Sequence, residues 1–195
     1  MLEPLAFVSG ALRLDQNAFQ AAVQTPGGLR LALGILLAGG ISNALGQSVA
    51  LFANRVRPRR FVASLVVGAV LFAATVTIYS AALAVASSLG WNRTASLRDI
   101  VTVVGLAHAP RLFAFVALVP YFGTALGAAL TLWTVVGLVT AAGALMDVPP
   151  LQAALLLGVA WIAVEAGGRT VGRPLVAANL RIRRWVAGAP LEKHP

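Results

Sequence analysis

The residues that could do chemistry lie inside apolar segments of the sequence. His108 and Arg111 are three positions apart on either side of Pro110, and Glu165 is charged and near the end of another apolar segment. Residues three apart share one face of a helix, and a charged side chain at mid-membrane costs about 2.5 to 3.5 kcal/mol on insertion scales. We therefore expect Arg111 to meet free carbonyl groups, water or a carboxylate, and Glu165 is the expected carboxylate.

These residues form a predicted polar intramembrane cluster, which comprises Asn43, Gln47, His108, Arg111 and Glu165. Three interpretations stay open. The cluster is a structural clamp in which the guanidinium satisfies carbonyls freed by Pro110, a contact for a partner or lipid, or a proton or ion relay. A local pair between Glu165 and Arg169, one helical turn apart, would remove the link between the two segments.

Signatures of common enzyme sites are absent from the sequence. The chain has no cysteine, no HExxH or GxSxG motif, and only six acidic residues. His194 is far along the chain from His108, and no carboxylate lies near His108 in the sequence, so a metal site is not expected. The sequence predicts a non-enzymatic protein with no catalytic residues, metal or cofactor.

Five apolar segments must position the polar residues. They lie at 31–53, 61–89, 100–119, 121–146 and 151–167. A hydrocarbon core of about 30 Å needs about 20 helical residues, and unbroken apolar runs exclude the alternating pattern of a membrane β-barrel. The predicted fold class is all-α, an integral membrane bundle of five transmembrane helices within a domain at 29–168.

The third and fourth segments follow each other without a charged break. Residues 100–146 contain only Arg111 as a charged residue, so their length requires two spans. The turn between them is expected at Val119 to Gly123. Pro110 should interrupt the third span and free a backbone carbonyl that needs another partner.

A short amphipathic helix is expected before the first span, within residues 1–28. From Leu5 to Val23, apolar residues recur at spacings of three, four and seven, and Pro26 with two glycines then ends the pattern. This helix lies either in the membrane interface or against the bundle.

The basic residues lie next to the spans. The formal net charge is +9, but aromatic and basic residues are not interleaved, which excludes a nucleic-acid partner. We expect contact with anionic lipid headgroups, and the residues for this contact are Arg55, Arg57, Arg59, Arg60, Arg181, Arg183, Arg184 and Trp185. The last three Arg and Trp185 belong to a basic tail at 169–195.

The distribution of Lys and Arg predicts an orientation. Five spans place the 54–60 loop and the tail on one side, with four plus six basic residues, against four on the other side. The positive-inside rule then puts the N-terminus outside and the C-terminus in the cytoplasm. The expected location is a bacterial plasma (inner) membrane.

Several short motifs resemble a known family. They are the segment at 10–15 with Phe19 and Pro26, Leu97-Arg98 followed by the segment at 104–110, Val119-Pro120 with Gly123, and the segment at 132–134. In this order they resemble bacterial members of the Yip-domain family, over about residues 5–165. The resemblance implies a five-helix membrane domain after an amphipathic segment, and in eukaryotic relatives it implies binding of Rab-type GTPases and a role in vesicle traffic.

The function expected from the sequence is that of a scaffold or an accessory subunit of a larger membrane assembly. The chain has little extramembrane mass, so its helix faces are its main contact surfaces. The expected partners are lipid, other membrane-protein subunits or a second copy of the chain. Two alternatives stay open: a small transporter or channel that uses the polar intramembrane cluster, and a membrane-shaping or trafficking factor.

Overall fold

The structure is a computed structural model and describes residues 3–46, 58–90, 95–119 and 121–170. These residues are helical, with no β-strand among them, which confirms the predicted all-α fold. The helices are α1 (Glu3–Leu12), α2 (Gln16–Gln24), α3 (Gly28–Gly46), α5 (Pro58–Gly90), α6 (Leu97–Ala107), the 3-10 helix η1 (Ala109–Leu118), α7 (Gly123–Met146) and α8 (Pro150–Thr170).

Five helical segments are long and apolar enough to cross a membrane. They are Gly28–Gly46, Phe61–Ser88, Leu97–Leu118, Gly123–Met146 and Pro150–Gly167. The third combines α6 with η1, and the other four are α3 and α7 in full and most of α5 and α8. Lipid offers backbone groups no hydrogen-bond partners, so an all-helical bundle satisfies them within each segment. The chain is an integral membrane protein, as its sequence predicts.

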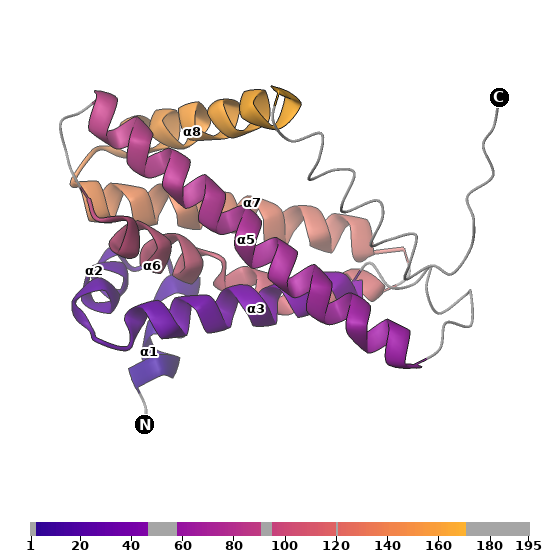
Figure 1. The fold of residues 1–195 in the computed structure, drawn as a ribbon. Helices are drawn as coiled ribbons and strands as arrows, with labels where there is room; N and C mark the ends of the chain where they lie inside the picture. Colours follow the sequence, from indigo (N-terminus) through magenta and orange to yellow (C-terminus); the bar gives the residue numbers. More distant parts are fainter. Residues whose placement is uncertain (1–2, 47–57, 91–94, 120, 171–195) are drawn as a thin grey trace.

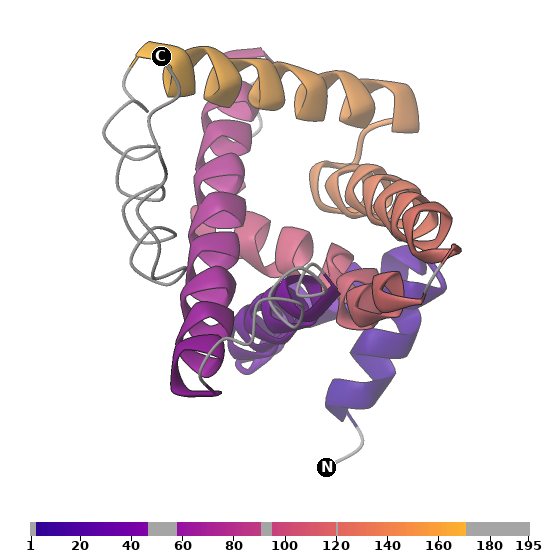
Figure 2. The ribbon, with the colours of Figure 1, turned by 90° about the vertical axis from the view of Figure 1, so that its right-hand side faces the viewer.

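The third span lies at the centre of the bundle. Every residue from Ile100 to Pro110 is buried. The helix α3 packs against α5, α6 and η1, while α8 lies along one edge of the bundle against α5 and α7 (Figures 1 and 2). In Figure 1 the starts of α3, α6 and α8 lie at the same end of the bundle as the ends of α5 and α7.

Small residues allow the central helices to approach closely. A Cβ atom added to Gly40 of α3 would lie 2.7 Å from the Ala69 Cα of α5. A Cβ atom added to Gly105 of α6 would lie 2.9 Å from the Ala32 Cβ of α3. Because real Cβ atoms do not come so close to such neighbours, these glycines set the spacing of the three helices.

The turn between the third and fourth spans is very short. η1 ends at Leu118 and α7 begins at Gly123. Tyr121 has a φ of 67°, a left-handed conformation that costs free energy for a residue with a side chain. A Cβ atom on Gly123 would collide with the carbonyl oxygen of Ala117, so the chain can reverse here only with glycine at this position.

The N-terminal segment forms two helices rather than one. Leu14 adopts a φ of 61° between α1 and α2, and the Asp15 carboxylate caps α2 by accepting from the Asn17 N–H. Phe19 and Ala22 of α2 are fully buried, and α2 packs against α6 and α7. The structure therefore shows α2 on the bundle, the second of the two arrangements considered for this segment.

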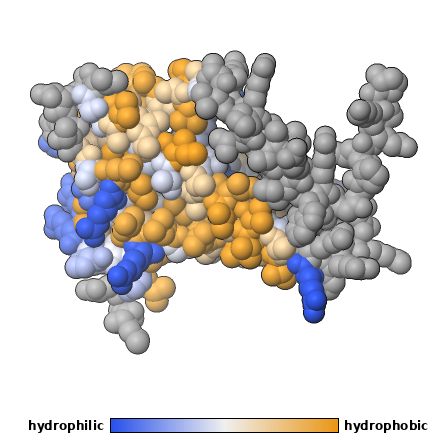
Figure 3. All heavy atoms as spheres, in the orientation of Figure 1, coloured by the Kyte–Doolittle hydropathy of each residue, from blue (hydrophilic) through white to orange (hydrophobic). Residues whose placement is uncertain are grey.

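The face of the bundle that Figure 3 shows is mainly apolar among the described residues. Hydrophilic residues gather in this view at the end where α2 and α6 begin. Exposed Val, Leu and Ile side chains extend along α5, α7 and α8. An apolar band with polar residues at its end is the surface expected of a protein surrounded by lipid.

Candidate functional site

The candidate site is the break in the third span together with a cavity beside it. The helix α6 ends at Ala107, and His108, with φ −83° and ψ 6°, joins it to η1. Pro110 has no N–H group and its ring clashes with the preceding turn of an α-helix, so the α-helical hydrogen bonds cannot continue through it. The predicted interruption of this span is confirmed, and it takes the form of a change to 3-10 geometry.

The His108 side chain completes the end of α6. Its backbone N–H donates to the Gly105 carbonyl at 3.2 Å, a 3-10 bond, instead of to the Val104 carbonyl of a regular α-helix. The His108 Nδ1 atom bonds to the Val104 carbonyl oxygen in place of the backbone N–H, at a distance of 2.7 Å. Because a carbonyl only accepts hydrogen bonds, Nδ1 must carry the proton and donate. The other ring nitrogen, Nε2, is left for other contacts.

Ser42 of α3 holds η1 from the neighbouring helix. Its hydroxyl donates to the Leu112 carbonyl at 2.9 Å and accepts from the Phe115 N–H, also at 2.9 Å. The Ser42 side chain is buried. One hydroxyl thus satisfies two backbone groups of the broken span, which lipid could not do. The role of Ser42 is not predicted from the sequence, although Ser42 lies among the small residues of the first span.

Arg111 lies at the start of η1 against α3. A Cβ atom on Gly39 would lie 3.2 Å from the Arg111 Cβ, so the glycine makes room for the arginine. The Arg111 Nε atom is buried and has no hydrogen-bond partner in the described part of the chain. At the break, the His108 side chain bonds to the Val104 carbonyl, and Ser42 bonds to the Leu112 carbonyl and the Phe115 N–H. The clamp role of the guanidinium stays a prediction.

The predicted polar intramembrane cluster is only partly brought together. Asn43 is half-buried on α3, next to Ser42, whereas Gln47 lies outside the described residues. Glu165 is exposed on α8, and α8 packs against α5 and α7 while η1 packs against α3 and α7. The expected contact between Arg111 and Glu165 is not supported by this packing, because their helices are not adjacent in the bundle.

Few of the residues predicted to contact headgroups are described. Arg59 is exposed in the first turn of α5, and Arg60 follows it in the same helix. The others lie outside the described residues: Arg55, Arg57, Arg181, Arg183, Arg184 and Trp185.

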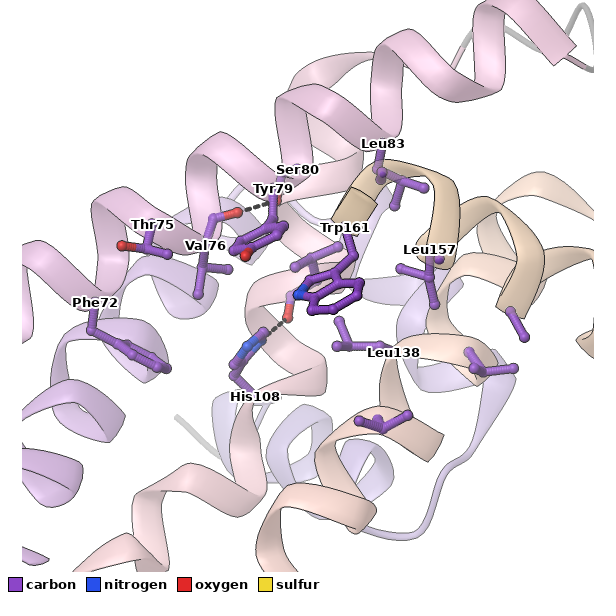
Figure 4. A pocket seen from close by; sticks show the side chains of 16 residues that line it. Phe72, Thr75, Val76, Tyr79, Ser80, Leu83, His108, Leu138, Leu157 and Trp161 are labelled. Atoms are coloured by element: carbon purple, nitrogen blue, oxygen red, sulfur yellow. Dashed lines mark hydrogen bonds between the residues drawn. The ribbon is translucent and has the colours of Figure 1, made fainter. Parts of the chain in front are cut away.

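A cavity of about 610 Å³ lies beside the break, between α5, α6, α7 and α8. Aliphatic and aromatic side chains line most of it, with Ser80 fully buried on its wall. Figure 4 shows the rings of Tyr79, Trp161 and His108 around this cavity, from three parts of the bundle. The Phe72 ring stands edge-on to the imidazole, with centroids 5.6 Å apart and an interplanar angle of 77°.

Sequence patterns alone do not predict this cavity. Its wall comes from the four helices α5 to α8, whose packing cannot be deduced from sequence patterns, and its aromatic residues look like ordinary core or lipid-facing residues. A weak signal was available in the small residues of the last span, Ala154, Gly158 and Ala160, which leave space next to α5 and α7.

The arrangement offers a cofactor or metal few ligands. In the described ranges, no group of three or more His, Cys, Asp or Glu side chains could hold a metal ion. Within the cavity, His108 supplies an imidazole nitrogen, and Ser80 and Tyr79 carry hydroxyl groups. Comparison of the chain with family models, with curated proteins and with solved structures found no significant match.

Proposed function

We propose that this integral membrane protein acts without enzymatic activity, as a scaffold or an accessory subunit of a larger membrane assembly. The observation that supports this proposal is that several polar side chains in the membrane-spanning helices form hydrogen bonds within the chain. Ser42, Ser80, His108 and Thr134 all bond to backbone carbonyls of the chain itself. The bonds of Ser42 and His108 hold the broken span in one arrangement, and those of Ser80 and Thr134 stay within α5 and α7. An ion or proton relay instead needs polar groups that face one another or water.

The outward helix faces are the surfaces through which such a subunit would act. Their exposed apolar residues include Val62, Val66 and Val70 on α5, Leu132, Val135 and Val136 on α7, and Leu151, Leu155 and Val159 on α8. Helix faces of this kind associate in a membrane by close packing. The partners proposed are other membrane-protein subunits or a second copy of the chain, with anionic lipid headgroups at the basic ends.

The mass of the protein in native lipid tests the proposal. The chain would be extracted from its membrane directly into polymer-bounded lipid discs, without detergent, and its protein mass measured. We expect a mass above the 20.1 kDa of one chain, with a fixed ratio of components. A single chain in every disc would overturn the proposal.

Three matched variants identify the face involved. Val66→Trp, Val136→Trp and Val159→Trp each add bulk to one outward face of α5, α7 or α8, where the parent side chain is exposed. Assembly through one face predicts that one variant falls to the mass of a single chain while the other two keep the parent mass. Equal masses for all three variants and the parent would exclude these faces.

Transport is the competing function, and flux measurements distinguish it. Proteoliposomes that contain the parent chain are expected to show no proton or ion flux above that of empty liposomes. Flux that depends on the protein and is abolished by Arg111→Ala would replace the scaffold proposal with a transporter that uses the polar break.

We also propose that the chain is a bacterial-type member of the Yip-domain family in a bacterial plasma membrane, with its C-terminus in the cytoplasm. Five spans after N-terminal helices are the architecture that this resemblance implies, and this supports the proposal. A membrane-shaping role has less support, because it needs the apolar face of the N-terminal segment in lipid, and Phe19 and Ala22 are buried against protein.

A further inference from the structure

The cavity next to the broken span contains a polar atom that the described structure does not use. His108 is 9% exposed and lines the cavity, and its Nδ1 atom is bonded to the Val104 carbonyl. No hydrogen bond joins its Nε2 atom to any described residue. A neutral imidazole that donates from Nδ1 has an acceptor at Nε2. The cavity wall holds no carboxylate that would stabilise a charged imidazolium.

The rest of the cavity suits an apolar molecule with rings. Its wall is mainly aliphatic, with the aromatic side chains of Phe72, Tyr79 and Trp161 in addition (Figure 4). Aromatic rings favour stacked or edge-to-face contact with other rings. The volume of about 610 Å³ lies within the range of about 300 to 1,000 Å³ that is usual for sites of small molecules.

The cavity reaches from the interior of the bundle to its lipid-facing surface. Ser80 and Leu83 on its wall are almost completely buried, whereas Val135 and Trp161 are 49% and 57% exposed. Both exposed residues lie in the middle part of membrane-spanning helices. A ligand would therefore enter from the bilayer, which selects molecules that dissolve in lipid.

We propose that this cavity binds a lipid-soluble ring alcohol, either a hydroquinone or a polycyclic alcohol, whose hydroxyl group donates to the His108 Nε2 atom. The hydroxyl is required because Nε2 accepts and an apolar wall leaves a polar group few other partners. The ring system fills the space between α5, α7 and α8. This inference goes beyond the proposed scaffold function and does not depend on it.

Two pairs of radiolabelled probes test the chemistry. The first pair is a hydroquinone with a decyl tail, kept reduced, and its dimethyl ether; the second is a sterol and its methyl ether. We expect one of the two alcohols to bind the purified chain in detergent saturably at one site. Its ether, which cannot donate a hydrogen bond, should bind at least tenfold more weakly. The alcohol that binds identifies the class of ligand.

Two glycine variants test the location. Gly158 lines the cavity and a Cβ atom added to it meets nothing within 4 Å, so Gly158→Leu fills space without a backbone collision. Gly127 on α7 is equally open but is not part of the cavity wall, which makes Gly127→Leu the control. Both changes favour the helix. Gly158→Leu should weaken binding at least tenfold, and Gly127→Leu should bind as the parent does.

Removal of the acceptor completes the test. His108→Leu should reduce affinity for the alcohol to that for its ether. Because this change also leaves the Val104 carbonyl without its partner, the glycine pair keeps the test valid if the His108 variant does not fold. Failure of both alcohols to bind, equal affinity for alcohol and ether, or unchanged binding in Gly158→Leu would each overturn the proposal.

Discussion

Two side chains at the broken span perform the hydrogen bonding that a regular helix would provide by itself. The His108 imidazole satisfies the carbonyl at the end of α6, and the Ser42 hydroxyl satisfies one donor and one acceptor of η1. In lipid, a backbone group without a partner costs several kcal/mol because water cannot replace the lost bond. A 3-10 segment can therefore persist within the third span.

Ser42→Ala should destabilise the protein strongly for so small a change. It removes the hydrogen bonds that the hydroxyl makes to the Leu112 carbonyl and to the Phe115 N–H, and each such bond contributes about 0.5 to 1.5 kcal/mol. The free energy of unfolding would be measured by titration with SDS in mixed micelles. Ser88→Ala is the matched control, since Ser88 is exposed and bonds only within its own helix. Equal stabilities of the two variants would contradict this account of Ser42.

The sequence predicts the break in the third span, but it does not predict which side chains bond to the backbone there. The ring and the missing N–H group of Pro110 exclude a regular helix, so the break can be predicted from this residue alone. The partners depend on which helices are neighbours, and Ser42 is 70 positions from Leu112. Glu165 was the expected partner of Arg111 because their charges are opposite, but charge does not determine helix order. The cavity was missed for the same reason.

Glycine and alanine residues set the distances between the helices of the bundle. Without a hydrophobic driving force between helices in lipid, close packing becomes a main source of association. Apolar length was enough to predict the five spans, because each must match the thickness of the bilayer. Which spans pack against each other could not be predicted, since small residues occur on several faces of every span.

Two glycines of α3 should respond to alanine with opposite signs. Gly40→Ala places a Cβ atom 2.7 Å from the Ala69 Cα and should destabilise the protein by about 1 to 3 kcal/mol through overpacking. Gly34→Ala meets nothing within 4 Å and should stabilise it by about 0.5 to 1 kcal/mol through reduced backbone entropy. The same SDS titration measures both. Stabilisation by Gly40→Ala would show that α3 and α5 are not in close contact.

The attachment of α2 to the bundle depends on Phe19. This side chain is completely buried, so Phe19→Ala should cost about 3 to 5 kcal/mol and release the helix. Trypsin should then cleave after Arg13 faster than in the parent. Leu5→Ala is the control, because Leu5 is 69% exposed and its loss should leave the cleavage rate unchanged. Unchanged cleavage in Phe19→Ala would instead place the helix in the membrane interface.

The five crossings determine which connections of the chain share a side of the membrane. The end of α2 and the α7–α8 connection lie at one end of the bundle, and the η1–α7 turn lies at the other. In the sequence, the basic residues at 54–60 and those after the fifth span follow an odd number of spans, as the η1–α7 turn does. From the positive-inside rule we propose that the side of the η1–α7 turn is the cytoplasmic one.

Single cysteines can test this arrangement cleanly, because the natural chain has none. Gln24→Cys, Phe122→Cys and Pro149→Cys each place one thiol at an exposed position in a connection or at a helix end. In intact cells, a maleimide that cannot cross membranes should label Gln24→Cys and Pro149→Cys, and it should label Phe122→Cys only after permeabilisation. The reverse pattern would keep the five crossings and invert the orientation. Labelling of Phe122→Cys and Pro149→Cys from the same side would mean that α7 does not cross the membrane, and the five-span arrangement would then be wrong.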